Sequence, residues 1–244
     1  MNTALLSGIV GVIFCAVFLG GVFPLYFRWV EKSIHLGLAF SAGIMLGVAF
    51  LHLMPEAFAL AGPKAGMGTL LGFLLLYVME KVMMVHACQD LQDDCEVHHV
   101  GIPAFIGLSL HAFTDGLAIG AGSLLSELAW VIAFAVLLHK LPSAFALTTL
   151  LLRAHYRKAK ILVLQGIFFL TIPLGIMVAR FWASGETTPQ LGFLLAFAAG
   201  TFIHIAFSDI LPELHLQHHR RFRYLIFFLF GVVLMYGANQ LSHH

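Results

Sequence analysis

The sequence predicts an all-α protein that crosses a membrane eight times. Only 10% of its 244 residues are charged and 60% are hydrophobic, whereas about a quarter of the residues in a typical soluble domain are charged. The mean hydropathy is +0.95, and uncharged apolar runs of about 20 residues, the length of a transmembrane helix, recur along the chain. Because no hydrophilic block is long enough for a separate soluble domain, we expect one transmembrane domain over residues 1–244.

The apolar runs define the order of the spans. We place them near residues 3–25, 34–58, 68–87, 101–123, 127–152, 161–182, 190–212 and 223–241. The net charge of +1 gives no electrostatic case for nucleic-acid binding. Three cysteines do not make a disulfide framework. The expected partners are therefore membrane lipid and a small ligand.

Basic residues predict the orientation of the chain. The even-numbered connections and both termini contain only Lys64 and Arg180, whereas the odd-numbered connections, with Lys81 close by, contain Arg28, Lys32, Arg153, Arg157, Lys158, Lys160, Arg220, Arg221 and Arg223. Cytoplasmic loops of membrane proteins carry an excess of Lys and Arg. We therefore expect the odd-numbered connections to face the cytoplasm and both termini to face outward, in the cell membrane rather than an organelle.

An internal repeat relates the second and seventh spans. Residues 40–56 read FSAGIMLGVAFLHLMPE and residues 197–213 read FAAGTFIHIAFSDILPE, with a shared Ala-Gly start and Pro-Glu end. The two spans are five apart, so they cross the membrane in opposite directions. We therefore expect spans 1–3 and 6–8 to form an inverted repeat around spans 4 and 5, an architecture typical of secondary transporters.

The inversion places an acidic patch at each side of the membrane. The expected outer mouth of a path contains His52 and Glu56, and the expected inner mouth contains Asp209, Glu213 and His215. The alternative interpretation is that these residues are ordinary helix ends at the membrane interface.

A group of ionisable residues lies at the middle of spans 4 and 5. His111 and Asp115 are four residues apart and share one helix face, and His139 falls at a similar depth. Pro142 lacks an N–H, so we expect a local helix break that frees a carbonyl. Ser143, one turn from His139, is a further candidate metal residue. Such residues are costly inside a membrane and by default indicate a functional site.

The residue types favour a metal ion. Two imidazoles and a carboxylate give three ligands and an open position, and they suit zinc and its first-row neighbours better than magnesium or calcium. Iron, manganese and cadmium are the alternative cargoes, and no organic cofactor is expected. The competing interpretation is that the histidines hydrogen-bond between helices while Lys140 neutralises Asp115.

HAFTDG in span 4 and HKLPSA in span 5, together with the repeated Ala-Gly…Pro-Glu element, resemble the ZIP (Zrt/Irt-like) family of divalent metal transporters. The resemblance covers essentially the whole chain. It implies alternating access, with elevator-like movement of a bundle that contains spans 4 and 5. It also implies zinc as the usual cargo, transport toward the cytoplasm and a homodimer.

The sequence departs from the usual family pattern of two adjacent metal sites. His111, Asp115 and His139 match the first site. The second site is not carried over, because its ligand positions are occupied by Ala112, Lys140, Ser143 and Ala144. We therefore expect a mononuclear site with the Lys140 ammonium as a built-in counter-charge.

Other polar residues have less specific interpretations. The connection HACQDLQDDCEVHH between spans 3 and 4 is either a solvated acidic loop or a metal-capture loop, with Cys88, Cys95, His98 and His99 as its ligands. The roles of Glu80 and His204 stay open.

An intramembrane zinc hydrolase is the alternative function, but spans 4 and 5 lack a midspan glutamate as general base. A metal-responsive receptor would need a larger external domain.

Overall fold

The computed structural model describes residues 3–26, 34–89, 101–183, 188–210 and 221–242. These residues are helical, with short turns between some helices and without a strand. Seven described helices are long and apolar enough to cross a membrane, and Phe222–Ala238 forms a shorter apolar helix. The predicted all-α, multi-pass membrane class is therefore confirmed.

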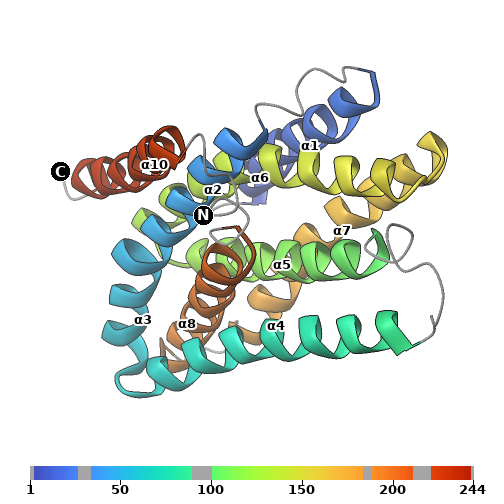
Figure 1. Ribbon diagram of the computed structural model, residues 1–244. Helices are drawn as coiled ribbons and strands as arrows, with labels where there is room; N and C mark the ends of the chain where they lie inside the picture. Colours follow the sequence, from blue (N-terminus) through green and yellow to red (C-terminus); the bar gives the residue numbers. More distant parts are fainter. Residues whose placement is uncertain (1–2, 27–33, 90–100, 184–187, 211–220, 243–244) are drawn as a thin grey trace.

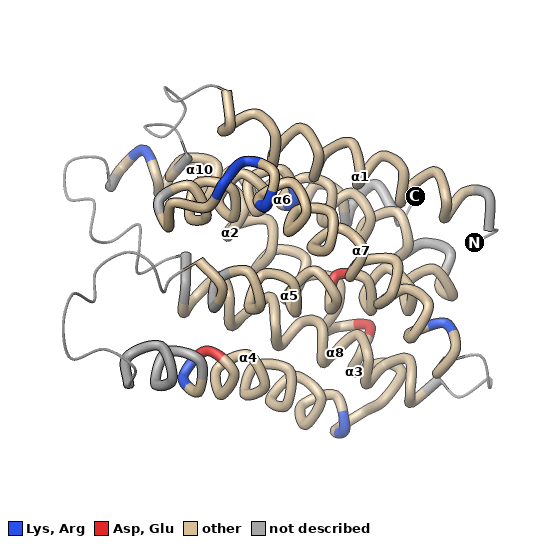
Figure 2. Tube along the Cα trace, turned by 90° about the vertical axis from the view of Figure 1, so that its right-hand side faces the viewer, with Lys and Arg blue, Asp and Glu red and all other residues tan. Residues whose placement is uncertain are grey.

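Figure 1 shows the helices in chain order. Their bounds are α1 Thr3–Tyr26, α2 Ile34–Val48, α3 Met54–Ala61, α4 Lys64–Gln89, α5 Gly101–Gly122, α6 Ser126–Arg153, α7 Lys158–Ala183, α8 Thr188–His204 and α10 Arg221–Ser242. Most Lys, Arg, Asp and Glu residues in the described chain lie near helix ends, and long stretches between the ends carry none (Figure 2). This distribution fits helices whose middle parts lie in hydrocarbon.

Two π-helical segments widen the helices that contain the repeated sequence. The segment η2, Ala49–Leu53, joins α2 to α3, and η3, Ile205–Ile210, continues α8. Each segment comes just before the Pro-Glu pair of its repeat in the sequence. A proline cannot donate the backbone hydrogen bond of a regular helix, which accounts for a locally wider turn at this point. Such turns are frequent at functional sites.

The most closely packed helix pairs fall into two groups. The first helix group consists of α1, α5, α6 and α7, in which α5 packs on α7 and α1 packs on α6. At Gly116 and Gly175 the α5 and α7 backbones are so close that an added Cβ would meet a backbone carbonyl. Small residues allow this type of close approach between membrane helices.

The second helix group consists of α2, α3, α4, α8 and α10. In this group α4 packs on α8 and α2 packs on α10. The helices approach most closely at four glycines, where an added Cβ would lie within 2.5 Å of a backbone carbonyl oxygen of the neighbouring helix: Gly43, Gly72, Gly200 and Gly231. The two groups meet mainly where α2 packs against α6 and α8 packs against α5.

Candidate metal centre

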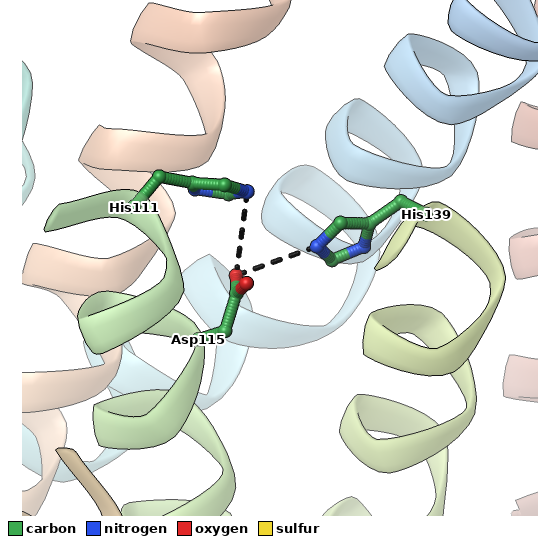
Figure 3. Close-up of side chains that lie close together, drawn as sticks. All are labelled: His111, Asp115 and His139. Carbon is green, nitrogen blue, oxygen red and sulfur yellow. Dashed lines mark ion pairs between the residues drawn. The ribbon is translucent and has the colours of Figure 1, made fainter. Parts of the chain in front are cut away.

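The centre is built on α5 and α6 of the first helix group. His111 and Asp115 lie one turn apart on α5, and His139 on α6 points toward them (Figure 3). All three side chains are fully buried. Asp115 Oδ1 lies 3.5 Å from His111 Nε2 and 3.4 Å from His139 Nε2. The structure therefore brings together the three residues that the sequence singled out.

Two of the three spacings between these atoms are those of one tetrahedrally bound ion. Ligand distances of about 2.0–2.1 Å place neighbouring ligand atoms of a tetrahedron roughly 3.3 Å apart, close to the two measured separations. The candidate ligand atoms of all three residues lie within 4.8 Å of one another. The arrangement offers three candidate ligands and would leave a fourth position for water or another donor.

The hydrogen bonding of the three side chains is incomplete in a way that suits a metal. Within the described chain, both ring nitrogens of His111, Nε2 of His139 and Oδ1 of Asp115 have no hydrogen-bond partner. Buried polar groups are normally hydrogen-bonded. His139 Nδ1 lies 2.8 Å from the carbonyl oxygen of Ala135. Donation to this carbonyl leaves Nε2 with its lone pair, as a metal ligand requires.

Lys140 occupies the other side of the same carboxylate. Its ammonium group donates to Asp115 Oδ2, and both side chains are fully buried. The Lys140 Nζ also lies 4.9 Å from the centre of the Phe168 ring on α7. The carboxylate therefore turns one oxygen to the imidazoles and the other to the ammonium group.

Ser143 and Pro142 follow on α6. The Ser143 hydroxyl donates to the backbone carbonyl of His139, at 2.8 Å. The predicted helix break at Pro142 is wrong, because α6 continues through it as one helix. The missing proline N–H removes one backbone bond, and the helix accommodates this loss without an interruption. Ser143 is buried, but its hydrogen is committed to the His139 carbonyl.

The sequence did not identify the residues of α8 that cover the centre. The Phe202 ring lies 5.5 Å from the His111 ring and 5.7 Å from the His139 ring, measured between ring centres. The Thr201 hydroxyl lies 3.0 Å from that of Thr114 on α5. Phe202 is one of many phenylalanines in the sequence, so only the packing of α8 on α5 reveals its position.

A polar contact also joins the helices of the first group. The Gln165 amide on α7 donates to the carbonyl of Ala144, at 2.7 Å, and to the hydroxyl of Thr148. Thr148 donates to the carbonyl of Gly21 on α1. These bonds connect α1, α6 and α7 inside an apolar environment, where satisfied polar contacts hold helices together.

Glu80 and His204 form a pair away from the centre. His204 Nε2 lies 3.2 Å from Glu80 Oε2, and Ser208 Oγ lies 3.4 Å from His204 Nδ1. The His204 ring also packs in a T-shaped arrangement with the rings of Phe73 and Tyr77. This pair links α4 to α8 and gives His204 a partner that could not be read from the sequence.

The remaining predicted residues are not part of the central cluster. His52 is buried in η2, and Glu56 lies in the first turn of α3. Asp209 and Cys88 belong to η3 and α4, but their side chains are outside the described set. Glu213, His215, Cys95, His98 and His99 lie outside the described residues. Among the described residues, the metal-compatible group contains only His111, Asp115 and His139.

The known proteins to which this chain is similar include zinc transporters. The family model for the ZIP zinc transporter matches residues 3–92 and 85–239. The chain is 25% identical to zinc transporter ZIP9-B of Xenopus laevis, with 80% of each chain covered. It is 27% identical to zinc transporter ZIP13 of Pongo abelii, with 89% of this chain and 74% of the relative covered. The chain belongs to the ZIP zinc transporter family.

Proposed function

We propose that this protein transports a divalent metal ion, zinc in the first place, across a membrane toward the cytoplasm. The observation that carries the proposal is the fully buried His111–Asp115–His139 group, whose candidate ligand atoms make no hydrogen bond. Zinc suits two imidazole nitrogens and one carboxylate oxygen. Iron, manganese and cadmium are the cargoes against which zinc is to be compared.

We propose that the centre holds one ion at a time. The support is Lys140, whose ammonium group is bonded to the carboxylate oxygen that a second cation would otherwise approach. Ser143, one turn from His139, is a weaker fourth ligand in this proposal, through a lone pair that its hydrogen bond does not use. An incomplete ligand set suits an ion that has to be released again.

The contacts of the second helix group support an inverted repeat. Gly231 lies against the Phe40 carbonyl, and Gly72 lies against the Phe197 carbonyl. Phe40 and Phe197 occupy the same position of the repeated sequence. The π-helical segments also fall at matching positions of the two copies. An inverted repeat provides two similar arrangements of opposite direction, which is the basis of alternating access.

We propose an elevator-like movement of the first helix group against the second. All three candidate ligands and Lys140 lie on α5 and α6, so the ion moves with a single group. The support is that the closest backbone contacts lie within each group and not between the two groups. The closest backbone approaches at the described glycines join helices of the same group, whereas α2 meets α6 at Gly37 in ordinary van der Waals contact, 3.8 Å from Pro142.

The proposal also covers the orientation of the chain, its oligomeric state and the path of the ion. Both termini face outward in the cell membrane, and two copies form a homodimer. The ion enters past His52 and Glu56 and leaves past Asp209, Glu213 and His215. A cytoplasmic segment with Cys88 at the end of α4, followed by Cys95, His98 and His99, captures it. The support for an entry path is that His52 is buried while Glu56, one turn further on, is partly exposed.

The alternative, an intramembrane zinc hydrolase, is not supported. The family and the relatives named above are zinc transporters. In addition, no glutamate occurs at midspan in α5 or α6 to act as a general base.

Liposomes containing the purified protein and a metal-sensitive dye test the function directly. We expect zinc-dependent fluorescence inside the vesicles, compared across zinc, iron, manganese and cadmium and with or without a pH gradient. His111→Ala and Asp115→Ala should abolish uptake, because each removes one of three ligands. His35→Ala, a half-buried histidine on α2, is the matched control and should retain uptake. Undiminished uptake by either ligand variant would refute the assignment.

A further inference from the structure

The Asp115 carboxylate serves two different groups at once. Oδ1 lies 3.4–3.5 Å from the ring nitrogens of His111 and His139, whereas Oδ2 accepts the hydrogen bond from Lys140. An ion can therefore bind at Oδ1 without displacing the ammonium group from Oδ2. In the metal-free centre the ammonium group is thus bonded to the carboxylate and leaves Oδ1 to the two imidazoles.

We propose that Lys140 keeps the unloaded centre electrically neutral and thereby allows the empty carrier to return across the membrane. The proposal rests on the transport function proposed above. It concerns a step that transport of an ion does not itself reveal, namely the movement of the centre after the ion has left.

The charges of the empty centre cancel. With neutral imidazoles, the form in which histidine binds metals, Asp115 contributes one negative charge and Lys140 one positive charge. Both side chains are fully buried. Without Lys140 the returning centre would carry an unpaired buried carboxylate, and removal of one partner of a buried ion pair is strongly unfavourable.

The position of Lys140 ensures that it moves with the carboxylate. Asp115 is on α5, Lys140 is on α6, and the Phe168 ring that the Nζ faces at 4.9 Å is on α7. All three helices belong to the first helix group, so a movement of this group leaves the ion pair and its cation–π contact intact. A neutralising residue on α8 would be left behind.

Lys140 has the opposite effect on the centre when the ion is bound, because it then destabilises the centre. An ion at Oδ1 adds two positive charges beside an ammonium group, and their repulsion at short range weakens the hold on the ion. Lys140 therefore costs affinity in the loaded state and aids release. This distribution of effects separates the proposal from a simple structural role, which would impair the loaded and the empty steps together.

The test compares two zinc fluxes through the same liposomes. Net uptake into zinc-free vesicles requires the empty carrier to return. Exchange of labelled zinc, with equal zinc on both sides, proceeds with the loaded carrier alone. For Lys140→Met we expect the ratio of exchange to net uptake to rise about tenfold or more, with tighter zinc binding. Lys140→Arg retains the positive charge and should keep the ratio of the unmodified protein.

Control variants and the unmodified protein complete the experiment. Lys64→Met removes an exposed lysine at the start of α4 and should leave the ratio unchanged. In the unmodified protein, exchange should exceed net uptake by less than about threefold, because the neutral centre returns readily. A much larger excess would overturn the proposal even if no Lys140 variant could be produced.

The outcomes distinguish this proposal from the function on which it rests. If the unmodified protein shows neither flux, the transport function itself fails. If the unmodified protein transports zinc but Lys140→Met lowers both fluxes equally, or leaves their ratio unchanged, the transport function stands and the role of Lys140 in the empty return is refuted.

Discussion

At the scale of single residues, Lys140 is the side chain that we propose limits the centre to one ion. Its ammonium group occupies Oδ2 of Asp115, where a second metal would need a ligand. Lys140→Glu replaces this cation with another carboxylate beside the same site. We expect the variant to bind two metal ions per chain where the unmodified protein binds one, measured by equilibrium dialysis and elemental analysis. Unchanged stoichiometry and transport would contradict the counter-charge role, and Lys140→Arg serves as the control.

Residue spacing also explains which parts of the centre were predictable. His111 and Asp115 could be paired from a helical repeat on one helix, and His139 could be added from its depth in the next span. Phe202 and Thr201 could not be found in this way, because no local pattern encodes which helix packs over α5. The ligand role of the three central residues stays a prediction, although the structure brings them together.

At the scale of helices, the contact of α5 with α7 fixes the position of two candidate ligands. An added Cβ at Gly116 would meet the carbonyl of Ile172, so Gly116→Ala must push α5, with His111 and Asp115, away from α7. Overpacking of this kind costs about 1–3 kcal/mol. We expect a lower melting temperature in detergent and weakened zinc uptake.

A second glycine on the same helix provides the control for this prediction. A Cβ at Gly107 would have no atom within 4 Å. Gly107→Ala should therefore retain uptake and melt at or slightly above the temperature of the unmodified protein, since alanine favours a helix. Equal behaviour of the two variants would show that the close approach of α5 to α7 does not position the centre.

Helix type was more predictable than helix detail. Hydropathy is a property of a whole segment, so it predicted the all-α membrane class. The break expected at Pro142 did not occur, because a helix can lose one backbone bond and still continue when its neighbours pack around it. The π-helical segments were missed as well, since the sequence shows the proline but not how the preceding turn adjusts.

At the scale of the whole molecule, the two helix groups are joined near the centre by Thr114 and Thr201, whose hydroxyls are 3.0 Å apart. In a cysteine-free background, Thr114→Cys with Thr201→Cys should form a disulfide that links the groups. If the groups must move, oxidation stops zinc uptake and a reductant restores it. Gly101→Cys with Ala154→Cys links α5 to α6 within one group and should not stop uptake. Full uptake by the oxidised Thr pair would contradict the elevator movement.

The orientation of the chain in the membrane can be tested separately. Lys64 lies at the start of α4, and Arg157 lies between α6 and α7. The distribution of basic residues predicts that Lys64 lies outside and Arg157 in the cytoplasm. In the same cysteine-free background, an impermeant maleimide added to intact cells should label Lys64→Cys but not Arg157→Cys. The reverse labelling pattern would invert the proposed direction of both termini.

The π-helical segment η2 has a consequence for sequence length. A π turn holds more residues than an α-helical turn, so Ala49–Leu53 rotates everything after it relative to an uninterrupted helix. Each residue of an α-helix accounts for about 100° of rotation. Deleting one residue from η2 would therefore let the helix close to regular geometry and leave Glu56 facing the same neighbours. Deleting one residue from the regular part of α2 has no wider turn to absorb it and would turn Glu56 by about 100°, so this span tolerates a change of length at η2 better than elsewhere.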